Sequence, residues 1–353
     1  MANGELINIR LSDDGTAVRI LDQTLLPGEE KYIELDSAEA MFEAIYALRV
    51  RGAPAIGIFA ACALYVLARQ IKTESYELFY KDILKYSAYL DSSRPTAVNL
   101  GTQLRRMESL VKSNCGQRVD QIVEAMRDEA DKIYNEDAAM CRAISEHGLT
   151  LIKDGYGIMT QCNAGPIATS KYGTALGSII LGKEKGLNLH AFICETRPLL
   201  QGARLTAFEL DRAGVDCTLI CDNMASIVMS EGKINAVFAG CDRIARNGDV
   251  ANKIGTSGLA ILAKHYSIPF YVFGPSTTID MDCATGEDIE IELRKPEEIK
   301  EMFYSKPMAP AHVKCYNPSF DVTSKDLITA IITEKGIVKI QSQINCDIFT
   351  NKL

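Results

Sequence analysis

The sequence lacks the spaced cysteines and histidines that hold metal ions. Its 11 cysteines form no CxxC pair, and its 4 histidines form no HExxH motif. Cys217 and Cys221 are close together, but no second pair follows at the spacing of a zinc site. We therefore expect no metal ion, and we expect most of the cysteines to be reduced thiols in the core of a cytoplasmic protein.

Motifs that bind nucleotides or activate a serine are also missing. The chain contains no GxxxxGK[ST] phosphate loop, no GxGxxG after an apolar run and no GxSxG. These absences argue against the binding of nucleoside triphosphates or dinucleotides, and against the usual α/β-hydrolase chemistry.

Positive charge and long apolar runs are scarce as well. The chain has 38 Lys and Arg residues against 46 Asp and Glu residues, and its net charge of −8 predicts no nucleic-acid partner. The longest uncharged run, residues 52–68, contains Pro54 and Gly57 and is shorter than the ~20 residues that a membrane-spanning helix needs. The first residues, MANGELINIR, lack the pattern of a secretory signal. We expect a buried helix at 52–68 and no membrane partner.

The pattern of residues changes near residue 148. Before residue 36, short β-prone stretches separated by turn residues predict an antiparallel meander. Helical patterns then dominate as far as His147, including a capping box of Asp36 and Glu39 and a long amphipathic helix over 119–145. We expect residues 1–147 to form an N-terminal domain with a β-meander followed by helices.

From residue 148 onwards, short apolar runs alternate with helical segments. The apolar runs are 156–160, 191–194, 217–221, 236–239 and 270–273, and the helical segments are 174–185, 205–214, 224–232 and 254–266. Continuous apolar strands between helices predict a parallel sheet covered on both faces, hence an α/β domain over residues 148–353. Right-handed crossovers place the loops that follow the strands at one edge of the sheet, where ligands bind.

These loops carry the candidate chemical groups. Cys162 follows the first strand and Asp242 follows the fourth. Each has a purely structural alternative: Cys162 as an inert buried thiol, and Asp242 as a helix cap or as the ion-pair partner of Arg243 or Arg246. Together with the Arg, Lys, Asn and Gln residues of the same loops, the pair suits a small phosphorylated and hydroxylated ligand.

Two segments are candidates for binding an anion. Arg51 precedes a helix with Pro54 in its first turn, and the amides of a helix N-terminus attract anions. Asn252 and Lys253 are expected to begin another helix. Arg51 and Arg94 also have the alternative of being surface charges whose stems cover apolar surface.

Over nearly its whole length, the chain resembles the family that methylthioribose-1-phosphate isomerases share with the regulatory subunits of eukaryotic translation initiation factor 2B. The segments that carry the resemblance, in order, are RGAPAIG (51–57), TQCNAG (160–165), ETRPLLQGARLTAFEL (195–210), DNMAS (222–226), GCDRIARNGDVANKIGT (240–256), GEDIEIELR (286–294) and NPSFDVT (317–323).

The resemblance implies a fold and a reaction. The expected fold is a small N-terminal domain on a Rossmann-like C-terminal domain, with a site between the domains and a homodimeric assembly. The expected reaction converts an aldose 1-phosphate into a ketose 1-phosphate in methionine salvage, with neither a metal nor an organic cofactor. The only expected partners are the sugar-phosphate substrate and a second copy of the chain.

The resemblance also assigns residues. Cys162 of TQCNAG and Asp242 of GCDRI match the family's catalytic pair. The positions that match its substrate-binding residues are Arg51, Gly52, Ala53, Arg94, Gln201, Asn252 and Lys253. Three departures from the family's usual pattern concern the shape of the pocket and its specificity for the sulfur group: Cys241, Pro166 and the FGPSTTID segment at 273–280.

The implied reaction gives the pair distinct tasks. Phosphate on O1 blocks the free aldehyde, so ring opening needs a proton from an acid that stays protonated in a water-poor site, the task of Asp242. Arg243 must then point away from Asp242. Cys162 either removes the C2 proton as a thiolate or assists a direct hydride transfer from C2 to C1, and the residues leave both routes open. Isomerases of 5-deoxyribose 1-phosphate or ribose 1,5-bisphosphate, and a non-catalytic regulatory subunit, are the alternatives.

Overall fold

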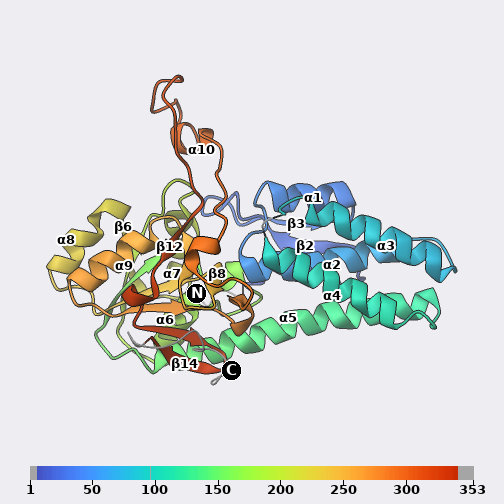
Figure 1. Cartoon of the computed structure of the whole chain (residues 1–353), viewed down its shortest axis with the longest axis horizontal. Helices are drawn as coiled ribbons and strands as arrows, with labels where there is room; N and C mark the ends of the chain where they lie inside the picture. The colour runs from blue at the N-terminus through green and yellow to red at the C-terminus, as the bar shows by residue number, and fades with distance from the viewer. Residues whose placement is uncertain (1–5, 96, 341–353) are drawn as a thin grey trace. The chain divides into compact units, whose positions relative to one another are not determined.

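The computed structural model describes residues 6–95 and 97–340 and divides into two compact units (Figure 1). Unit 1 comprises Met1–Ala139 and Pro166–Lys171, and unit 2 comprises Met140–Gly165 and Tyr172–Leu353. The division falls within helix α5 (Val119–Leu149), the amphipathic helix predicted over 119–145, so the expected boundary at residues 147 and 148 lies inside a continuous helix. The short return of residues 166–171 to unit 1 has no signal in the sequence pattern.

Unit 1 begins with a three-stranded antiparallel sheet. Its strands are β1 (Ile9–Leu11), β2 (Val18–Leu21) and β3 (Tyr32–Leu35), in the order β1-β2-β3. Ile9 pairs with Ile20, and both side chains are fully buried, while Arg19 on the opposite face lies over the ring of Tyr32. This alternation confirms the predicted meander.

The helices of unit 1 pack around one apolar helix. They are α1 (Ala38–Tyr46), α2 (Ala53–Gln70), α3 (Tyr76–Asp91), α4 (Val98–Ser113) and the first part of α5. Helix α2 is long and apolar enough to cross a membrane, but 78% of that stretch is buried inside the protein, as the sequence predicts. Helix α1 is capped by Ser37, whose Oγ accepts from Ala40 N, so the predicted capping box of Asp36 and Glu39 is wrong by one residue.

Unit 2 is built on a seven-stranded sheet. In chain order its strands are β4 (Gly157–Gln161), β5 (His190–Cys194), β6 (Asp216–Ile220), β7 (Ala236–Gly240), β10 (Phe270–Phe273), β13 (Ala330–Thr333) and β14 (Gly336–Lys339). Their spatial order is β14-β13-β10-β7-β4-β5-β6, and every pair is parallel except β13 with β14. The chain leaves the middle of the sheet in both directions from β4 and β7, as in a Rossmann-type fold.

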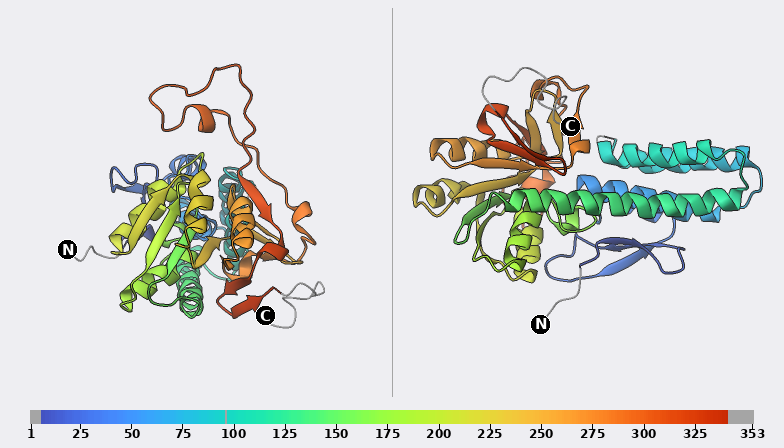
Figure 2. Two further views of the ribbon diagram at one scale, coloured as in Figure 1. Left: turned by 90° about the vertical axis from the view of Figure 1, so that its left-hand side faces the viewer. Right: turned by 90° about the horizontal axis from the view of Figure 1, so that it is seen from below.

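Helices cover both faces of this sheet (Figure 2). Helices α8 (Ala225–Ser230) and α9 (Thr256–His265) pack on the face that carries Met159 and Val237. Helices α6 (Ala175–Glu184) and α7 (Ala207–Arg212), with the end of α5, pack on the face that carries Ile158 and Phe238. Successive strand residues thus face opposite cores, which explains the continuous apolar runs and confirms the predicted doubly covered sheet.

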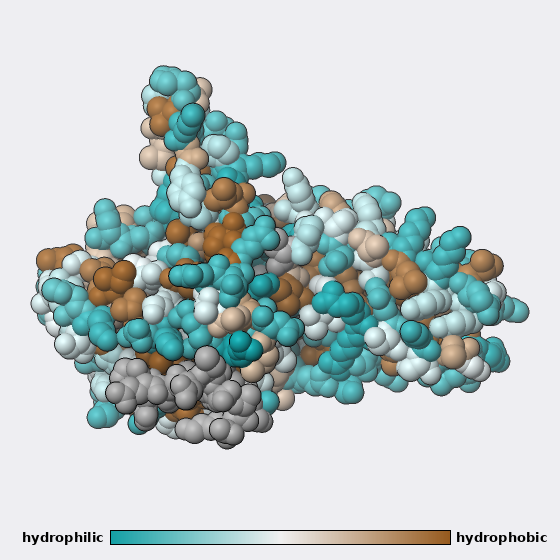
Figure 3. All heavy atoms as spheres, viewed as in Figure 1, coloured by the Kyte–Doolittle hydropathy of each residue, from teal (hydrophilic) through white to brown (hydrophobic). Residues whose placement is uncertain are grey.

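A second sheet and an arm extend unit 2. The sheet has the order β11-β8-β9-β12, with β8 (Arg243–Ala245), β9 (Val250–Lys253), β11 (Ile279–Asp280) and β12 (Phe320–Thr323). Between β11 and β12, residues 293–318 form the arm that carries α10 (Glu297–Lys300), closed at its base by a bridge between Leu293 and Pro318. The arm exposes both polar and apolar side chains (Figure 3). Met302 and Met308 are among its exposed apolar residues.

Candidate active site

The two predicted catalytic residues follow neighbouring strands at the centre of the sheet. Gln161 of β4 pairs with Ala239 of β7 in the parallel register. Cys162 is the first residue after β4, and Asp242 is the second after β7. The strand order reverses between β4 and β7, and ligands of open α/β sheets bind outside the carboxyl ends of the strands at this point.

Cys162 has an unusual backbone that its neighbours hold at both ends. Its φ of 62° lies in the left-handed region, which non-glycine residues seldom adopt. Its N–H donates to Thr196 Oγ1 at 2.9 Å, and its carbonyl accepts from Thr206 Oγ1 at 2.6 Å. Strained backbone of this kind is found preferentially at functional sites.

The rest of the TQCNAG loop is fixed by a buried carboxylate. Asn163 Nδ2 donates to Glu209 Oε2 and, at 3.2 Å, to Thr206 Oγ1. A Cβ atom at Gly165 would lie 2.3 Å from Glu209 Oε2, so only glycine fits beside the carboxylate. Glu209 is 3% exposed. No local sequence pattern indicates Glu209, because its burial depends on packing between segments 46 residues apart.

Asp242 and Arg243 diverge. The guanidinium of Arg243 lies 3.6 Å from the Asp280 carboxylate, so the prediction that Arg243 is engaged elsewhere is confirmed. Asp242 N donates to Ala251 O at 2.9 Å, which fixes the backbone at this position. The Asp242 side chain is exposed, not enclosed by apolar residues as expected. Its Gly and Ile neighbours in the sequence instead face the core.

Cys241 lies beside Asp242 and has a different role. Its thiol donates to Phe273 O at 3.6 Å. Burial, and then the neighbouring Asp242 carboxylate, raise the pKa of the Cys241 thiol far above its ordinary value. Cys241 therefore stays protonated and packs as a small apolar side chain.

Gln201 carries an unsatisfied polar atom. It lies at the start of a π-helical turn, Gly202–Thr206, a distortion that is frequent at functional sites. The side chain is 4% exposed, and among the described residues its Oε1 has no hydrogen-bond partner. Because a buried acceptor without a donor is costly, this amide is suited to a ligand hydroxyl.

Asn252 and Lys253 end strand β9 and do not begin a helix, which corrects the expectation of an anion site at a helix N-terminus. Helix α9 begins only at Thr256. The Asp321 carboxylate already accepts from the amides that precede and open this helix, Gly255 N at 2.7 Å and Ser257 N at 3.0 Å. The local sequence VANKIG does not predict the pairing of β9 with β12. Through this pairing, Asp321 of β12 occupies the N-terminus of helix α9.

The side chains of both residues nevertheless form hydrogen bonds. Asn252 Nδ2 donates to Thr256 Oγ1 at 3.0 Å. Lys253 Nζ donates to Ser319 O at 3.0 Å and lies 4.3 Å from the centre of the Phe320 ring. Both of these contacts of the Lys253 ammonium are with uncharged groups, a carbonyl oxygen and an aromatic ring.

The remaining predicted binding residues belong to unit 1. Gly52, with φ 100°, caps helix α2, and Ala53 is the first residue of the helix. Arg51, immediately before this cap, is 9% exposed, which argues against the surface alternative. Arg94 is half-buried in the turn that connects α3 and α4.

The loop that follows TQCNAG shapes this part of unit 1. A Cβ atom at Gly52 would lie 2.5 Å from Ala168 O. The Ile167 carbonyl accepts from Asn8 Nδ2 at 2.8 Å and from Gln23 Nε2 at 3.0 Å, which holds the 166–171 segment in unit 1. Glycine is therefore required at position 52 both by its left-handed backbone and by this close approach.

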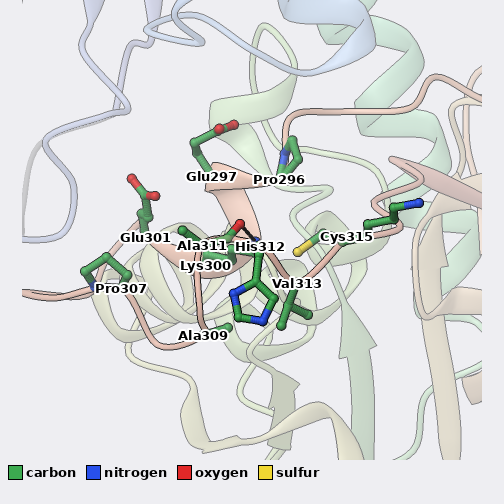
Figure 4. Close-up of a pocket in the computed structure, with 11 residues that line it drawn as sticks. Pro296, Glu297, Lys300, Glu301, Pro307, Ala309, Ala311, His312, Val313 and Cys315 are labelled. Atoms are coloured by element: carbon green, nitrogen blue, oxygen red, sulfur yellow. Dashed lines mark hydrogen bonds between the residues drawn. The ribbon is translucent and has the colours of Figure 1, made fainter.

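A separate pocket lies on the arm (Figure 4). It has a volume of about 400 Å³, and His312 and Cys315 are among the residues that line it. The Lys300 ammonium donates to Pro310 O and Ala311 O, at 3.3 and 3.0 Å, and so holds the turn of the arm together. Within the described residues, no three His, Cys, Asp or Glu side chains form a group that could hold a metal ion. The ten cysteines among the described residues are free thiols, and Cys346 lies outside the described residues.

Comparison with known proteins finds relatives that match nearly the whole chain. A methylthioribose-1-phosphate isomerase of Symbiobacterium thermophilum is 57% identical over 94% of this chain and 92% of its own length. A 5-deoxyribose 1-phosphate isomerase of Petrotoga mobilis is 56% identical over 94% of this chain and 96% of its own length.

Solved structures share the fold. A 5-methylthioribose 1-phosphate isomerase of Pyrococcus horikoshii superposes with a TM-score of 0.88 at 39% identity, over 94% of this chain and 92% of that one. The structure titled translation initiation factor eIF-2B, subunit delta, from A. fulgidus gives 0.85 at 40% identity, over 95% and 96% of the two chains. The model of the initiation factor 2 subunit family matches residues 49–340, and this chain belongs to that family.

Proposed function

We propose that this chain is an aldose–ketose isomerase that converts 5-methylthioribose 1-phosphate into 5-methylthioribulose 1-phosphate in methionine salvage. The observation that carries the proposal is the placement of Cys162 and Asp242 after neighbouring parallel strands at the point where the strand order reverses. The 57% identity to a methylthioribose-1-phosphate isomerase supports the same substrate.

Asp242 is the acid that opens the ring. Phosphate on O1 prevents formation of a free aldehyde, so the furanose oxygen must be protonated while C1 keeps its phosphate. The guanidinium of Arg243, the next residue, is directed to Asp280. The Asp242 side chain is exposed, so bound substrate must displace the water around it before the carboxyl can hold a proton near neutral pH.

Cys162 serves the hydrogen transfer from C2 to C1. In one route its thiolate removes the C2 proton and the proton is returned to C1. In the other route, hydride passes directly from C2 to C1 while Cys162 assists removal of the proton from the 2-hydroxyl. Substrate deuterated at C2 separates them: retention of deuterium in the product supports hydride transfer, and washout into solvent supports the thiolate.

The cationic and amide groups hold the substrate. The matching motifs assign Arg51, Arg94 and Lys253 to substrate binding. Cations of this kind donate charge-assisted hydrogen bonds, which are the strong ones that a phosphate dianion accepts. The buried Gln201 Oε1 accepts from a sugar hydroxyl, and Asn252, Gly52 and Ala53 complete the binding set. These assignments follow the matching motifs.

A 5-deoxyribose 1-phosphate isomerase is the second candidate, because a relative with that name is 56% identical. A 5-deoxy sugar needs a smaller apolar pocket at C5, whereas ribose 1,5-bisphosphate needs an additional cation there. The purified chain should be assayed alone on all three sugar phosphates. The highest kcat/KM on the methylthio sugar supports the proposal, and a preference for either other sugar reassigns the substrate. No turnover of any of them favours a regulatory binding subunit.

We also propose that the chain acts as a cytoplasmic homodimer, binds neither nucleic acid nor membrane, and needs no cofactor. The family resemblance supports the dimer, and the net charge of −8 disfavours an anionic partner such as nucleic acid. Sedimentation equilibrium tests the dimer. Turnover by protein dialysed against a chelator tests independence of a metal ion.

A further inference from the structure

Two residues at the carboxyl ends of neighbouring strands share a strained backbone. Cys162 follows β4 with φ 62°, and Thr196 follows β5 with φ 64°. The left-handed region is costly for any residue with a Cβ, and a β-branched residue such as threonine is a clear outlier there. Such conformations persist only where the surroundings fix them. The bonds around Thr196 are therefore informative.

Thr196 links Cys162 to the next strand through its hydroxyl. Thr196 Oγ1 accepts from Cys162 N at 2.9 Å and donates to Cys194 O at 3.0 Å. The side chain is fully buried, so no solvent water replaces either bond. Both the donor and one acceptor site of the hydroxyl are thus used to hold the strand ends of β4 and β5 together.

Asp222 fixes Thr196 in turn. It follows β6 at the start of a 3₁₀ turn, Asp222–Met224. One carboxylate oxygen accepts from Thr196 N at 2.7 Å, and the other accepts from Arg197 N at 2.8 Å. Hydrogen bonds to an ionised acceptor are about twice as strong as neutral ones. A single carboxylate thereby holds two successive amides of the loop after β5.

We propose that Asp222 and Thr196 are positioning residues for Cys162, and that their chain of hydrogen bonds across three neighbouring strands sets the place of the Cys162 backbone from which its thiol reaches the sugar. The kinetic test of this proposal rests on the proposed isomerase function. The second test, the rate of alkylation of Cys162, does not depend on that function. Thr206, which donates to the Cys162 carbonyl, completes the hold from the other side.

The test compares Thr196→Val with Thr196→Ser and Asp222→Asn. Valine keeps the shape but leaves the Cys162 amide without its acceptor, serine restores the hydroxyl, and Asp222→Asn removes one carboxylate acceptor. Thr329→Val is the matched control, because Thr329 Oγ1 accepts from Phe270 N at 3.0 Å at the opposite end of the sheet. The readouts are kcat, KM and the rate at which iodoacetamide alkylates Cys162, resolved by peptide mass spectrometry against exposed Cys115.

We expect Thr196→Val to lower kcat on the order of 10²-fold with little change in KM, because a small misplacement of a reacting group costs about that much. It should also change the alkylation rate of Cys162 and leave that of Cys115 unchanged. Thr196→Ser should restore both readouts, Asp222→Asn should share the defect, and Thr329→Val should match wild type.

Equal kinetics and equal Cys162 alkylation in Thr196→Val and Thr329→Val would overturn the proposal. A wild-type protein that turns over none of the sugar phosphates would refute the isomerase function instead, and alkylation would still decide the positioning role. If Thr196→Val fails to fold, Asp222→Asn against wild type gives the same decision.

Discussion

The guanidinium of Arg243 lies 3.6 Å from the carboxylate of Asp280 on the neighbouring strand β11, although Arg243 is the next residue after Asp242. The ion pair directs the guanidinium of Arg243 to Asp280. Both partners are about one-third exposed, so the pair contributes less than about 1 kcal/mol to stability. Its main consequence concerns the protonation of Asp242.

Asp280→Asn should therefore shift the pH profile and leave the fold unchanged. Asparagine keeps Oδ1, which accepts from Asp282 N and Cys283 N, but no longer attracts Arg243. A released guanidinium beside Asp242 favours its ionised form, so the fall of kcat at higher pH should move to lower pH. Asp282→Asn, an exposed neighbour, is the control. Superimposable profiles of Asp280→Asn and wild type would contradict this account of Arg243.

Loss of either catalytic group should abolish most turnover without unfolding the protein. Asp242→Asn and Cys162→Ser should each lower kcat on the order of 10³-fold, since positioned acid–base groups contribute that much. Asp326→Asn and Cys115→Ser, at exposed positions, should behave as wild type. The check is steady-state kinetics together with circular dichroism. Variants of both residues with near-normal kcat would show that the site lies elsewhere.

Gln201→Leu should separate binding from stability. The buried Oε1 of Gln201 has no partner among the described residues, so its removal costs no hydrogen bond within them and relieves a desolvated acceptor. We expect KM for the sugar phosphate to rise about tenfold, with Tm equal to or above that of wild type. A lower Tm with unchanged KM would instead mark Gln201 as a structural residue.

Asp321 should make stability depend on pH. Burial raises its pKa, and the hydrogen bonds from Ser257 N and Gly255 N only partly oppose this effect. The folded state then holds the proton more tightly than the unfolded state, so this contribution is present below the unfolded pKa and is lost as pH rises through the folded pKa.

The comparison is between wild type and Asp321→Asn in urea unfolding at pH 4, 5, 6 and 7. The stability advantage of wild type over the variant should decrease as pH rises. An advantage that grows with pH would mean that the two backbone donors outweigh burial.

The sequence predicts what depends on local pattern. The run Ala236–Gly240 is apolar at every position because both of its faces are buried, and such a run identifies a central parallel strand. Strands β8 and β9 could not be predicted in this way, because they are short, contain Arg243 and Lys253, and depend on pairing with distant segments. The expectation that Lys253 begins a helix failed for this reason.

The site shows the same limit. Motifs located Cys162 and Asp242, since each directly follows a predicted strand, and the register of β4 with β7 brings the two strand ends together. The hydrogen bonds that fix the Cys162 backbone are made with Thr196 and Thr206, which lie 34 and 44 residues away in the sequence. No local sequence pattern predicts these bonds. The exposure of Asp242 is likewise a property of the folded chain.

Gly52→Ala should destabilise unit 1 and lower activity together. The residue has φ 100°, and an added Cβ would lie 2.5 Å from Ala168 O, which is backbone and cannot rotate away. The left-handed conformation alone costs of order 1–3 kcal/mol for a residue with a Cβ, and the clash adds to it. Because Gly52 caps helix α2 next to Arg51, the displacement should also raise KM for the phosphorylated substrate.

Gly116→Ala is the matched control, since among the described residues no atom lies within 4 Å of an added Cβ there. We expect it to retain the Tm and KM of wild type, whereas Gly52→Ala loses several degrees in Tm. Thermal unfolding and steady-state kinetics of the two alanine variants measure the difference. If both variants kept the wild-type Tm, the 166–171 segment would have to move away from the added Cβ at little cost in free energy. The close approach of Ala168 would then not be what requires glycine at position 52.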